Sequence, residues 1–157
     1  MLITFNNNHF TMYLSLLFVL TWSCGPSVAQ FMLNYPPAIG TDASTEMQAP
    51  CGGFDSGMNN LTTPSINLTV GAFPIQLASM SNTSQWSFRA TIDETIPYEW
   101  TSLMNVVNET GQGSFCVPEA RVPADWAGKA GLVQVVQRTM NQTLYQVWFR
   151  FVQQIND

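Results

Sequence analysis

The chain has 157 residues, of which 46% are apolar, with ten acidic and five basic side chains and a formal net charge of −5 at pH 7. This length and apolar content suit one folded domain and exclude a disordered tail. Five basic residues in an acidic chain also disfavour nucleic-acid binding. The only histidine is His9. Everything after residue 29 therefore lacks an imidazole base, an imidazole metal ligand and a serine–histidine triad.

The first 29 residues carry no charged side chain, and their centre is an apolar stretch of eleven residues, Met12 to Trp22. This stretch is shorter than the roughly 20 residues of a membrane-spanning helix. Pro26 follows it, and then the small residues Ser27-Val28-Ala29. The order is typical of a secretory signal peptide. We therefore expect cleavage after Ala29, with residues 1–29 as the leader and residues 30–157 as the domain; a retained anchor helix is the alternative that the short length disfavours.

Five Asn-x-Ser/Thr sequons follow the leader, and this pattern accepts N-linked glycans on exposed turns of secreted proteins. They begin at Asn60, Asn67, Asn82, Asn108 and Asn141. Their number agrees with the leader and indicates a secreted or cell-surface glycoprotein. The alternative is a set of accidental matches in a β protein rich in threonine and asparagine.

Cys51 and Cys116 are the only cysteines after the leader. In an oxidising compartment we expect one disulfide between them. It would close a loop of about 65 residues and contribute about 4 kcal/mol in the loop-entropy model. Two unpaired thiols are the alternative.

The domain is expected to consist of β-strands, because its apolar segments are separated by turns rich in Gly, Pro, Asn and Ser. Residues 31–35 are a short strand candidate. Residues 86–93 alternate apolar and polar side chains without a fault, as a half-buried strand does. One face of this strand carries Trp86, Phe88, Ala90 and Ile92, and the other carries Ser87, Arg89, Thr91 and Asp93.

The second half of the domain has one segment with helical spacing and two further strand candidates. Residues 98–107 space Trp100, Leu103 and Val107 as one short helix would. Residues 132–136 and 143–152 are strand candidates. In the latter, one face holds Tyr145, Val147, Phe149 and Phe151, and the other, which we expect to be partly covered too, holds Gln146, Trp148, Arg150 and Val152.

Together these elements predict an all-β fold, an immunoglobulin-like antiparallel β-sandwich with one short helix at most. A closed barrel is the alternative.

Several motifs in the domain carry a resemblance to a known family. They are Gln30-Phe-Met-Leu-Asn-Tyr-Pro-Pro37, Glu46, Ala49-Pro-Cys-Gly-Gly-Phe54, Phe73-Pro-Ile75, Gly113-Ser-Phe-Cys-Val-Pro118, Val122-Pro123, Gln134-Val135 and Leu144-Tyr-Gln146. In this order and spacing the chain resembles the fungal copper-acquisition-factor family, secreted relatives of lytic polysaccharide monooxygenases. The resemblance implies the same sandwich, a secreted or cell-surface setting, and copper binding without oxidation of polysaccharide.

The resemblance also implies a copper site built from an N-terminal histidine, a second histidine and an aspartate, but this chain departs from it at each position. The residue exposed by the expected cleavage is Gln30, residues 79–83 read Ser-Met-Ser-Asn-Thr around Met80, and Phe149 stands where the aspartate is expected. Cu(II) favours nitrogen and oxygen donors in a tetragonal arrangement. A glutamine at the N-terminus can also cyclise to a lactam, which removes the basic lone pair of the amine. We therefore expect the copper site to be absent. The cysteine of the family's Tyr-Gln-Cys run is replaced by Val147, which weakens the disulfide prediction.

Methionines could replace histidines as copper ligands, because thioethers favour Cu(I). Those after the leader are Met32, Met47, Met58, Met80, Met104 and Met140. They form no Met-x-Met or Met-x-x-Met cluster, so we expect them to fill gaps in the core instead.

An enzyme is the next possibility. Asp93, Glu94 and Glu99 are the carboxylates that could form a hydrolase pair. A glycosidase needs two carboxylates that flank a substrate groove. Asp93 and Glu94 are neighbours at a strand end, so we expect a solvated turn there and no catalytic residues.

Carbohydrate binding would need tryptophans exposed in a row. The candidates are Trp100, Trp126 and Trp148, with Trp126 the best because it lies in a loop. The chain closes with Gln153 to Asp157, so we expect no hydrophobic tail of the kind a lipid anchor needs.

The sequence thus predicts a secreted, non-enzymatic, monomeric glycoprotein with a degenerate copper site and no cofactor. The alternatives are a copper-binding protein that aids extracellular copper uptake and a module that binds cell-wall polysaccharide or another cell-surface component.

Overall fold

The computed structural model describes residues 31–55, 66–67, 72–126, 129–149 and 151–152. The expected leader, residues 1–29, and the Asn60 sequon lie outside these residues. The elements are β1 (Phe31–Tyr35), β2 (Ile66–Asn67), β3 (Ala72–Ser79), β4 (Thr83–Thr91), β5 (Thr101–Ser102), β6 (Val107–Thr110), β7 (Gly113–Arg121), the short 3-10 helix η2 (Ala124–Trp126), β8 (Leu132–Arg138), β9 (Thr143–Phe149) and β10 (Phe151–Val152).

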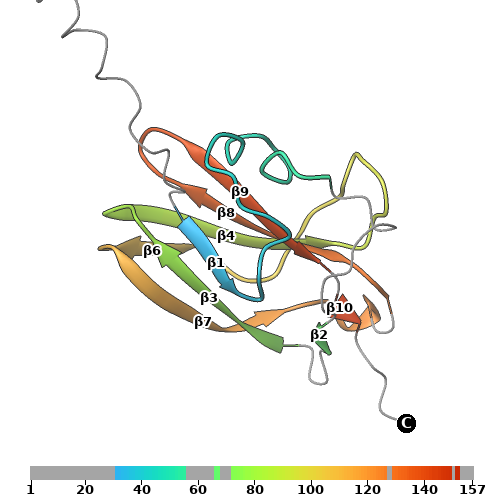
Figure 1. Cartoon of the computed structure of the whole chain (residues 1–157). Helices are drawn as coiled ribbons and strands as arrows, with labels where there is room; N and C mark the ends of the chain where they lie inside the picture. Colours follow the sequence, from blue (N-terminus) through green and yellow to red (C-terminus); the bar gives the residue numbers. More distant parts are fainter. Residues whose placement is uncertain (1–30, 56–65, 68–71, 127–128, 150, 153–157) are drawn as a thin grey trace, which may run out of the picture.

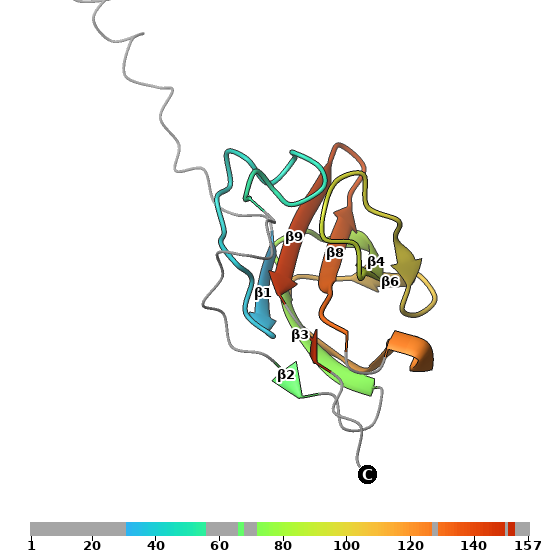
Figure 2. The same cartoon turned by 90° about the vertical axis from the view of Figure 1, so that its right-hand side faces the viewer.

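Two antiparallel sheets form the fold. The three-stranded sheet has the order β1-β3-β7, and the five-stranded sheet has the order β5-β4-β8-β9, with β6 also pairing with β4. A short parallel pair joins β2 and β10. Figures 1 and 2 show the two larger sheets facing each other as layers. The predicted all-β sandwich is therefore confirmed.

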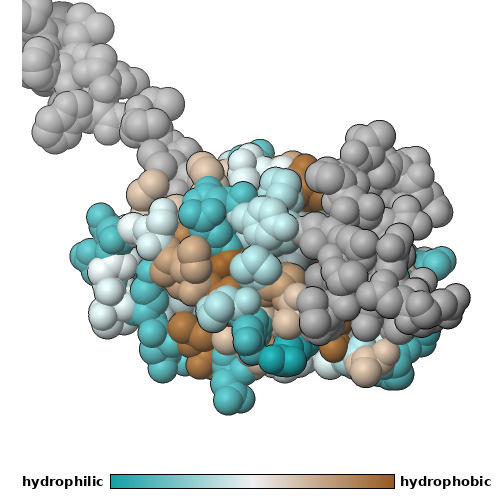
Figure 3. Space-filling model, turned by 90° about the horizontal axis from the view of Figure 1, so that it is seen from below, coloured by the Kyte–Doolittle hydropathy of each residue, from teal (hydrophilic) through white to brown (hydrophobic). Residues whose placement is uncertain are grey.

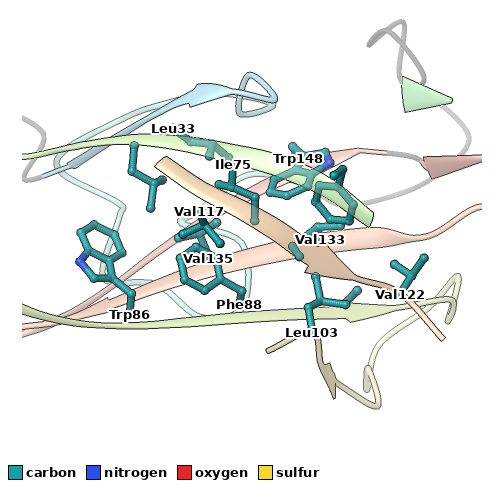
Figure 4. Packing of buried hydrophobic residues seen from close by; sticks show 14 of the residues in the cluster. Leu33, Ile75, Trp86, Phe88, Leu103, Val117, Val122, Val133, Val135 and Trp148 are labelled. Atoms are coloured by element: carbon teal, nitrogen blue, oxygen red, sulfur yellow. The ribbon is translucent and has the colours of Figure 1, made fainter. Parts of the chain in front are cut away.

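The core lies between the layers because the strands alternate inward apolar and outward polar side chains. In β4, Trp86, Phe88 and Ala90 are buried as the sequence predicts. Figure 4 shows Leu33 and Ile75 of the three-stranded sheet facing residues of the other layer. Burial contributes about 1.5–3 kcal/mol for each large apolar side chain.

Two edge-to-face aromatic pairs pack in this core. Phe31 and Trp86 have ring centroids 5.1 Å apart, and Phe73 and Trp148 have centroids 5.4 Å apart, both T-shaped. Such pairs contribute about 0.5–1.5 kcal/mol beyond area burial. The first pair lies at one end of the sandwich and the second toward the other, because Trp86 pairs with Gln137 on β8 and Trp148 pairs with Val133.

The face of β9 that points into the core is the one that carries Gln146 and Trp148, not the more apolar face that carries Tyr145 and Val147. Leu144 and Trp148 belong to the core cluster, and Gln146 is buried between them. Tyr145 and Val147 lie on the opposite, outer face of the sheet. Both faces of β9 are covered, as the sequence predicts, and Trp148 lies in the core between the two sheets.

A long loop, residues 36–55, covers the outer face of β8 and β9, as Figure 1 shows above these strands. Ile39 N–H donates to Val147 O (2.9 Å) and Tyr145 N–H donates to Glu46 O (2.8 Å). Gln134 Nε2 donates to Pro50 O. Residues 132–137 of β8 are consequently all buried, which explains why this strand reads as nearly continuous apolar sequence.

Gly52 shows why the Pro-Cys-Gly-Gly-Phe motif needs glycine. Its φ is +66°, a left-handed conformation that glycine adopts without strain. A Cβ at this position would lie 2.3 Å from Tyr145 O, the backbone of β9. Any side chain at Gly52 would push the loop away from the sheet.

The predicted short helix over residues 98–107 is wrong. Residues Thr101–Ser102 and Val107–Thr110 form β5 and β6, and both pair with β4. Leu103 is buried in the core, and its N–H donates to Phe88 O (2.9 Å). The three-to-four spacing of this segment reflects two short strand pairings. In the described residues, η2 is the helical element.

The outer face of the three-stranded sheet is mixed in character. Figure 3, which views the molecule from the side of β3 and β7, shows small hydrophobic patches among hydrophilic residues. None of the helices in the described part of the chain is long and apolar enough to cross a membrane.

Candidate functional site

A buried glutamine connects the motifs that lie farthest apart in the sequence. Gln146 Oε1 accepts a hydrogen bond from Leu33 N–H (3.0 Å), and its Nε2 donates to Phe31 O (2.9 Å) and to Glu46 Oε1 (2.6 Å). Glu46 and Gln146 are both buried. The first strand of the domain is thus tied to β9 and to the covering loop by one amide.

A second polar cluster is buried where β1 begins. Gln137 Nε2 donates to Ser84 Oγ (2.8 Å) and Ser79 Oγ (3.2 Å). Phe31, the first residue of β1, pairs with Ser79. Gln137 Oε1 is buried with no hydrogen-bond partner among the described residues. This cluster occupies the region in which the family resemblance implies the second histidine.

These donors do not fit copper. Ser79, Ser84 and Gln137 offer hydroxyl and amide groups, whereas Cu(II) favours imidazole nitrogen and Cu(I) favours thiolate and thioether sulfur. Gln137 also directs its amide N–H groups, which cannot coordinate a cation, at both hydroxyls. In the described residues, no three His, Cys, Asp or Glu side chains are grouped as metal ligands would be.

Of the positions implied as ligands, the two that the structure describes, at Met80 and Phe149, lie far apart. Met80 directly follows β3 and is exposed, at the end of the sandwich where β1 begins. The backbone of Phe149 pairs with Leu132, five residues along β8 from Gln137, which is about 17 Å in an extended strand. The side chains of Phe149 and Gln30 lie outside the described part of the structure.

The predicted Cys51–Cys116 disulfide is not formed in the structure. Cys51 is buried within the covering loop, next to Gly52, which lies against the backbone of β9, and Cys116 is exposed on β7. Cys116 pairs with Gln76, so its side chain points away from the core between its inward neighbours Phe115 and Val117. The two cysteines thus belong to opposite layers of the sandwich.

The methionines were expected to fill the core, and this is wrong for most of those described. Met104 packs partly buried against the core. The exposed ones are Met32, Met47, Met80 and Met140. Met32 pairs with Ala78, so it and Met80 lie toward the same end of the three-stranded sheet, while the other two exposed methionines lie elsewhere.

The candidate hydrolase carboxylates organise a turn. Asp93 Oδ2 accepts hydrogen bonds from Thr91 Oγ1 (2.9 Å) and Glu99 N–H (2.6 Å). Glu94 and Glu99 are exposed. Asp93 therefore has a local structural role, in agreement with the solvated turn that the sequence predicts.

The three candidate sugar-stacking tryptophans do not form a row. Trp126 and Trp148 are only 8% and 2% exposed, so the best candidate from the sequence is wrong. Trp126 is buried because η2 folds its ring against the core cluster. Trp100 is half-buried on the surface.

Trp100 lies in a cluster that the sequence did not reveal. Arg89 Cζ is 5.2 Å from the centroid of its ring, and Tyr98 packs edge-on against it with centroids 5.5 Å apart. Arg89 Nε also donates to Gln134 Oε1. Partial burial lowers the pKa of Arg89 below its ordinary value, as does nearby Arg138 to a smaller degree. The signal in the sequence that could have pointed to this cluster is Gln134, a glutamine within the apolar segment 132–136.

Three sequon asparagines have described side chains, Asn82, Asn108 and Asn141, and all are exposed. Asn67 belongs to β2, but its side chain is outside the described part of the structure. The geometry therefore allows glycans at three of the predicted positions.

Comparison with known proteins identifies the family. A family model described as copper acquisition factor BIM1-like matches residues 28–153. No match was found among curated proteins. The match covers most of the chain, including both polar clusters and the covering loop, and this family suggests an extracellular or cell-surface location. The chain belongs to the copper acquisition factor BIM1-like family.

Proposed function

We propose that this protein is a secreted or cell-surface glycoprotein of the copper acquisition factor BIM1-like family that is not an enzyme and whose copper site is degenerate. The observation that carries the proposal is the buried Ser79–Ser84–Gln137 cluster. It fills the region of the implied second histidine with hydroxyl groups that bind the amide N–H groups of Gln137.

The chemistry of the remaining donors supports the loss of copper binding. With no histidine after His9, a copper ion would have the N-terminal amine of Gln30 as its one strong nitrogen donor. Cyclisation of Gln30 would remove that donor as well. A divalent copper ion that needs several nitrogen or charged oxygen ligands is not held by hydroxyls and amides.

The proposal that the protein is not an enzyme rests on the placement of its carboxylates. Asp93 is hydrogen bonded within its own turn, and Glu46 is buried against Gln146. A carboxylate pair flanking a substrate groove, as glycoside hydrolysis requires, is not formed by these residues.

Equilibrium dialysis of the purified secreted protein against Cu(II) and Cu(I) tests the proposal. We expect no stoichiometric retention of either ion, and no difference between the natural protein and Met80→Ala. Stoichiometric Cu(II) binding would overturn the proposal and favour a role in copper uptake. Stoichiometric Cu(I) binding that Met80→Ala abolishes would overturn it in favour of a thioether site.

Carbohydrate binding is the second candidate function, and the surface position of Trp100 favours it. Aromatic faces and a few fixed polar groups are what a small binding site needs. Sedimentation of the protein with intact cell walls tests this role. We expect Trp100→Ala to reduce the bound fraction; binding that is absent, or unchanged in Trp100→Ala, removes this candidate.

A further inference from the structure

One part of the five-stranded sheet is left open by the covering loop and carries two arginines on the same face. Arg89 pairs with Gln134, and Gln85 pairs with Arg138. Because alternate residues of a strand share a face, Arg89 and Arg138 both point outward. We call the open area formed by Arg89, Arg138, Tyr145 and Trp100 the arginine surface. Arg138 is exposed, and the other three are half-buried.

Arg89 is held in one orientation on this surface. The loop fixes Gln134 through Pro50 O, and Gln134 in turn accepts the Nε–H of Arg89. The ring of Trp100 lies 5.2 Å from the guanidinium carbon. The guanidinium is thus oriented, and its Nη1 and Nη2 atoms make no hydrogen bond to the described residues. A donor that is fixed in advance loses less entropy when a ligand binds.

The two arginines have no carboxylate partner in the described part of the chain. The ion pair that the structure shows there joins Arg121 to Glu119 on β7, in the other sheet. Arg138, a group of the same sign, is near enough to act on the charge of Arg89. In a protein of net charge −5, this face therefore carries two arginines that form no ion pair with the described residues.

We propose that the arginine surface binds a saccharide that carries carboxylate or phosphate groups. Guanidinium groups bind both anions through paired hydrogen bonds, and the aromatic ring of Trp100 offers an apolar face to a sugar ring. The proposal rests on the extracellular setting of the proposed function but does not depend on the absence of copper.

The spacing of the charges favours an extended ligand. Gln134, beside Arg89, and Arg138 are four residues apart on β8, about 13 Å in an extended strand. A chain of sugar units with repeated acidic groups can contact both arginines, whereas one small anion contacts one of them.

Binding of the secreted protein to immobilised polygalacturonate, phosphomannan and neutral mannan tests the proposal, with polyglutamate as an acidic polymer that is not a saccharide. We expect retention on at least one of the two acidic polysaccharides, which also separates carboxylate from phosphate recognition. We expect neither mannan nor polyglutamate to bind comparably. Arg89→Gln should weaken binding about tenfold or more, the effect of losing one charge-assisted pair.

Arg121→Gln is the matched control, because it removes one positive charge from the opposite sheet, where the side chain is exposed. It should change the affinity less than twofold. Arg138→Gln, an exposed position with no described packing role, keeps the test valid if Arg89→Gln lowers stability, and it should also weaken binding. Equal losses in Arg121→Gln and Arg89→Gln, comparable binding to polyglutamate or mannan, or no binding to either acidic polysaccharide would each overturn the proposal. Dialysis of the same samples against copper tests the proposed function separately, because copper retention and polysaccharide binding are independent measurements.

Discussion

The side chain of Gln146 joins segments of the domain that lie far apart in the sequence. Its amide joins Phe31 and Leu33, more than a hundred residues earlier in the chain, to the Glu46 carboxylate. A buried polar group is costly unless its hydrogen bonds are made. The amide therefore fixes where the first strand and the covering loop lie relative to β9.

Replacing Gln146 should show this role directly. Gln146→Leu removes three buried hydrogen bonds and leaves backbone groups of β1 without their partners, so the free energy of unfolding should fall by about 2–4 kcal/mol. Gln85→Leu is the control, since Gln85 is exposed and makes one long bond of 3.4 Å to Asn108. Urea denaturation followed by tryptophan fluorescence measures both. Equal effects of the two substitutions would contradict the account of Gln146.

Asp42 gives a second residue with a defined electrostatic effect. Its Oδ1 accepts hydrogen bonds from the Ser44 hydroxyl (2.7 Å) and the Ser44 N–H (2.9 Å). These bonds, the side-chain bond first, lower the pKa of Asp42 below its ordinary value. A carboxyl pKa that is lower in the folded state contributes stability above the unfolded value, and this contribution is lost as the pH falls through the folded pKa.

An NMR titration of the Asp42 carboxyl tests this effect. In Ser44→Ala, we expect the pKa of Asp42 to rise toward its ordinary value, because the strongest of the two hydrogen bonds is gone. Ser114→Ala, which alters an exposed serine on β7, should leave the titration unchanged. The account fails if Ser44→Ala titrates like the natural protein.

At the scale of an element, β4 shows how one alternating strand organises the sandwich. Phe88 is fully buried, while Ser87 lies half-buried on the outer face. The same strand pairs with β5, β6 and β8, so its register sets the position of most of the five-stranded sheet.

Two neighbouring substitutions in β4 should therefore differ sharply. Phe88→Ala leaves a core cavity and should lower the free energy of unfolding by about 3–5 kcal/mol. Ser87→Ala should change it by less than about 0.5 kcal/mol. Thermal or chemical unfolding of both variants measures the difference, and similar values would mean that the strand register is wrong.

The elements that could be predicted from the sequence are those with a local signal. The alternation of β4 and the short apolar runs of β1 and β8 each appear within a few residues, and the structure confirms them. Residues 98–107 could not be assigned correctly, because Leu103 is positioned by its pairing with Phe88 and not by its own neighbours in sequence. The burial of Trp148 likewise depends on Phe73, which lies in a different sheet.

The sequence shows which copper ligands are missing from the candidate site, but it does not show which side chains come together there. The missing histidines can be read directly from the chain. The Gln137 cluster, the separation of Cys51 from Cys116 and the stacking of Arg89 on Trp100 all depend on long-range register. Exposed methionines were also missed, since Met is apolar in sequence but four of those described lie at the surface.

At the scale of the whole molecule, three sequons gather at one end of the sandwich. Asn82 directly precedes β4, Asn108 pairs with Gln85 near the start of that strand, and Asn141 lies in the turn after Arg138, which also pairs with Gln85. Asn82 O accepts a hydrogen bond from Gly111 N–H, which links the two turns (2.8 Å). Glycans at these positions would shield the turns at this end. Arg138, on the outer face of β8 beside these turns, lies at the margin of the shielded area, and Trp100 and Arg89 lie toward the middle of the sheet.

Oxidative footprinting of methionines tests this arrangement. Met140, which is 96% exposed, precedes Asn141, whereas Met47, which is 58% exposed, lies in the covering loop. Enzymatic removal of N-glycans should accelerate oxidation of Met140 and leave Met47 unchanged. Identical rates for Met140 before and after glycan removal would contradict a glycan shield at this end.

The most direct test of the central claim is native mass spectrometry of the secreted protein with one equivalent of Cu(II). We predict a chain that begins at Gln30, as the free amine or as its lactam, and that carries N-glycans but no retained copper. A stoichiometric copper adduct that survives a competing chelator, or a chain that begins at His9, would contradict the account, because either would show that a nitrogen-rich copper site is present.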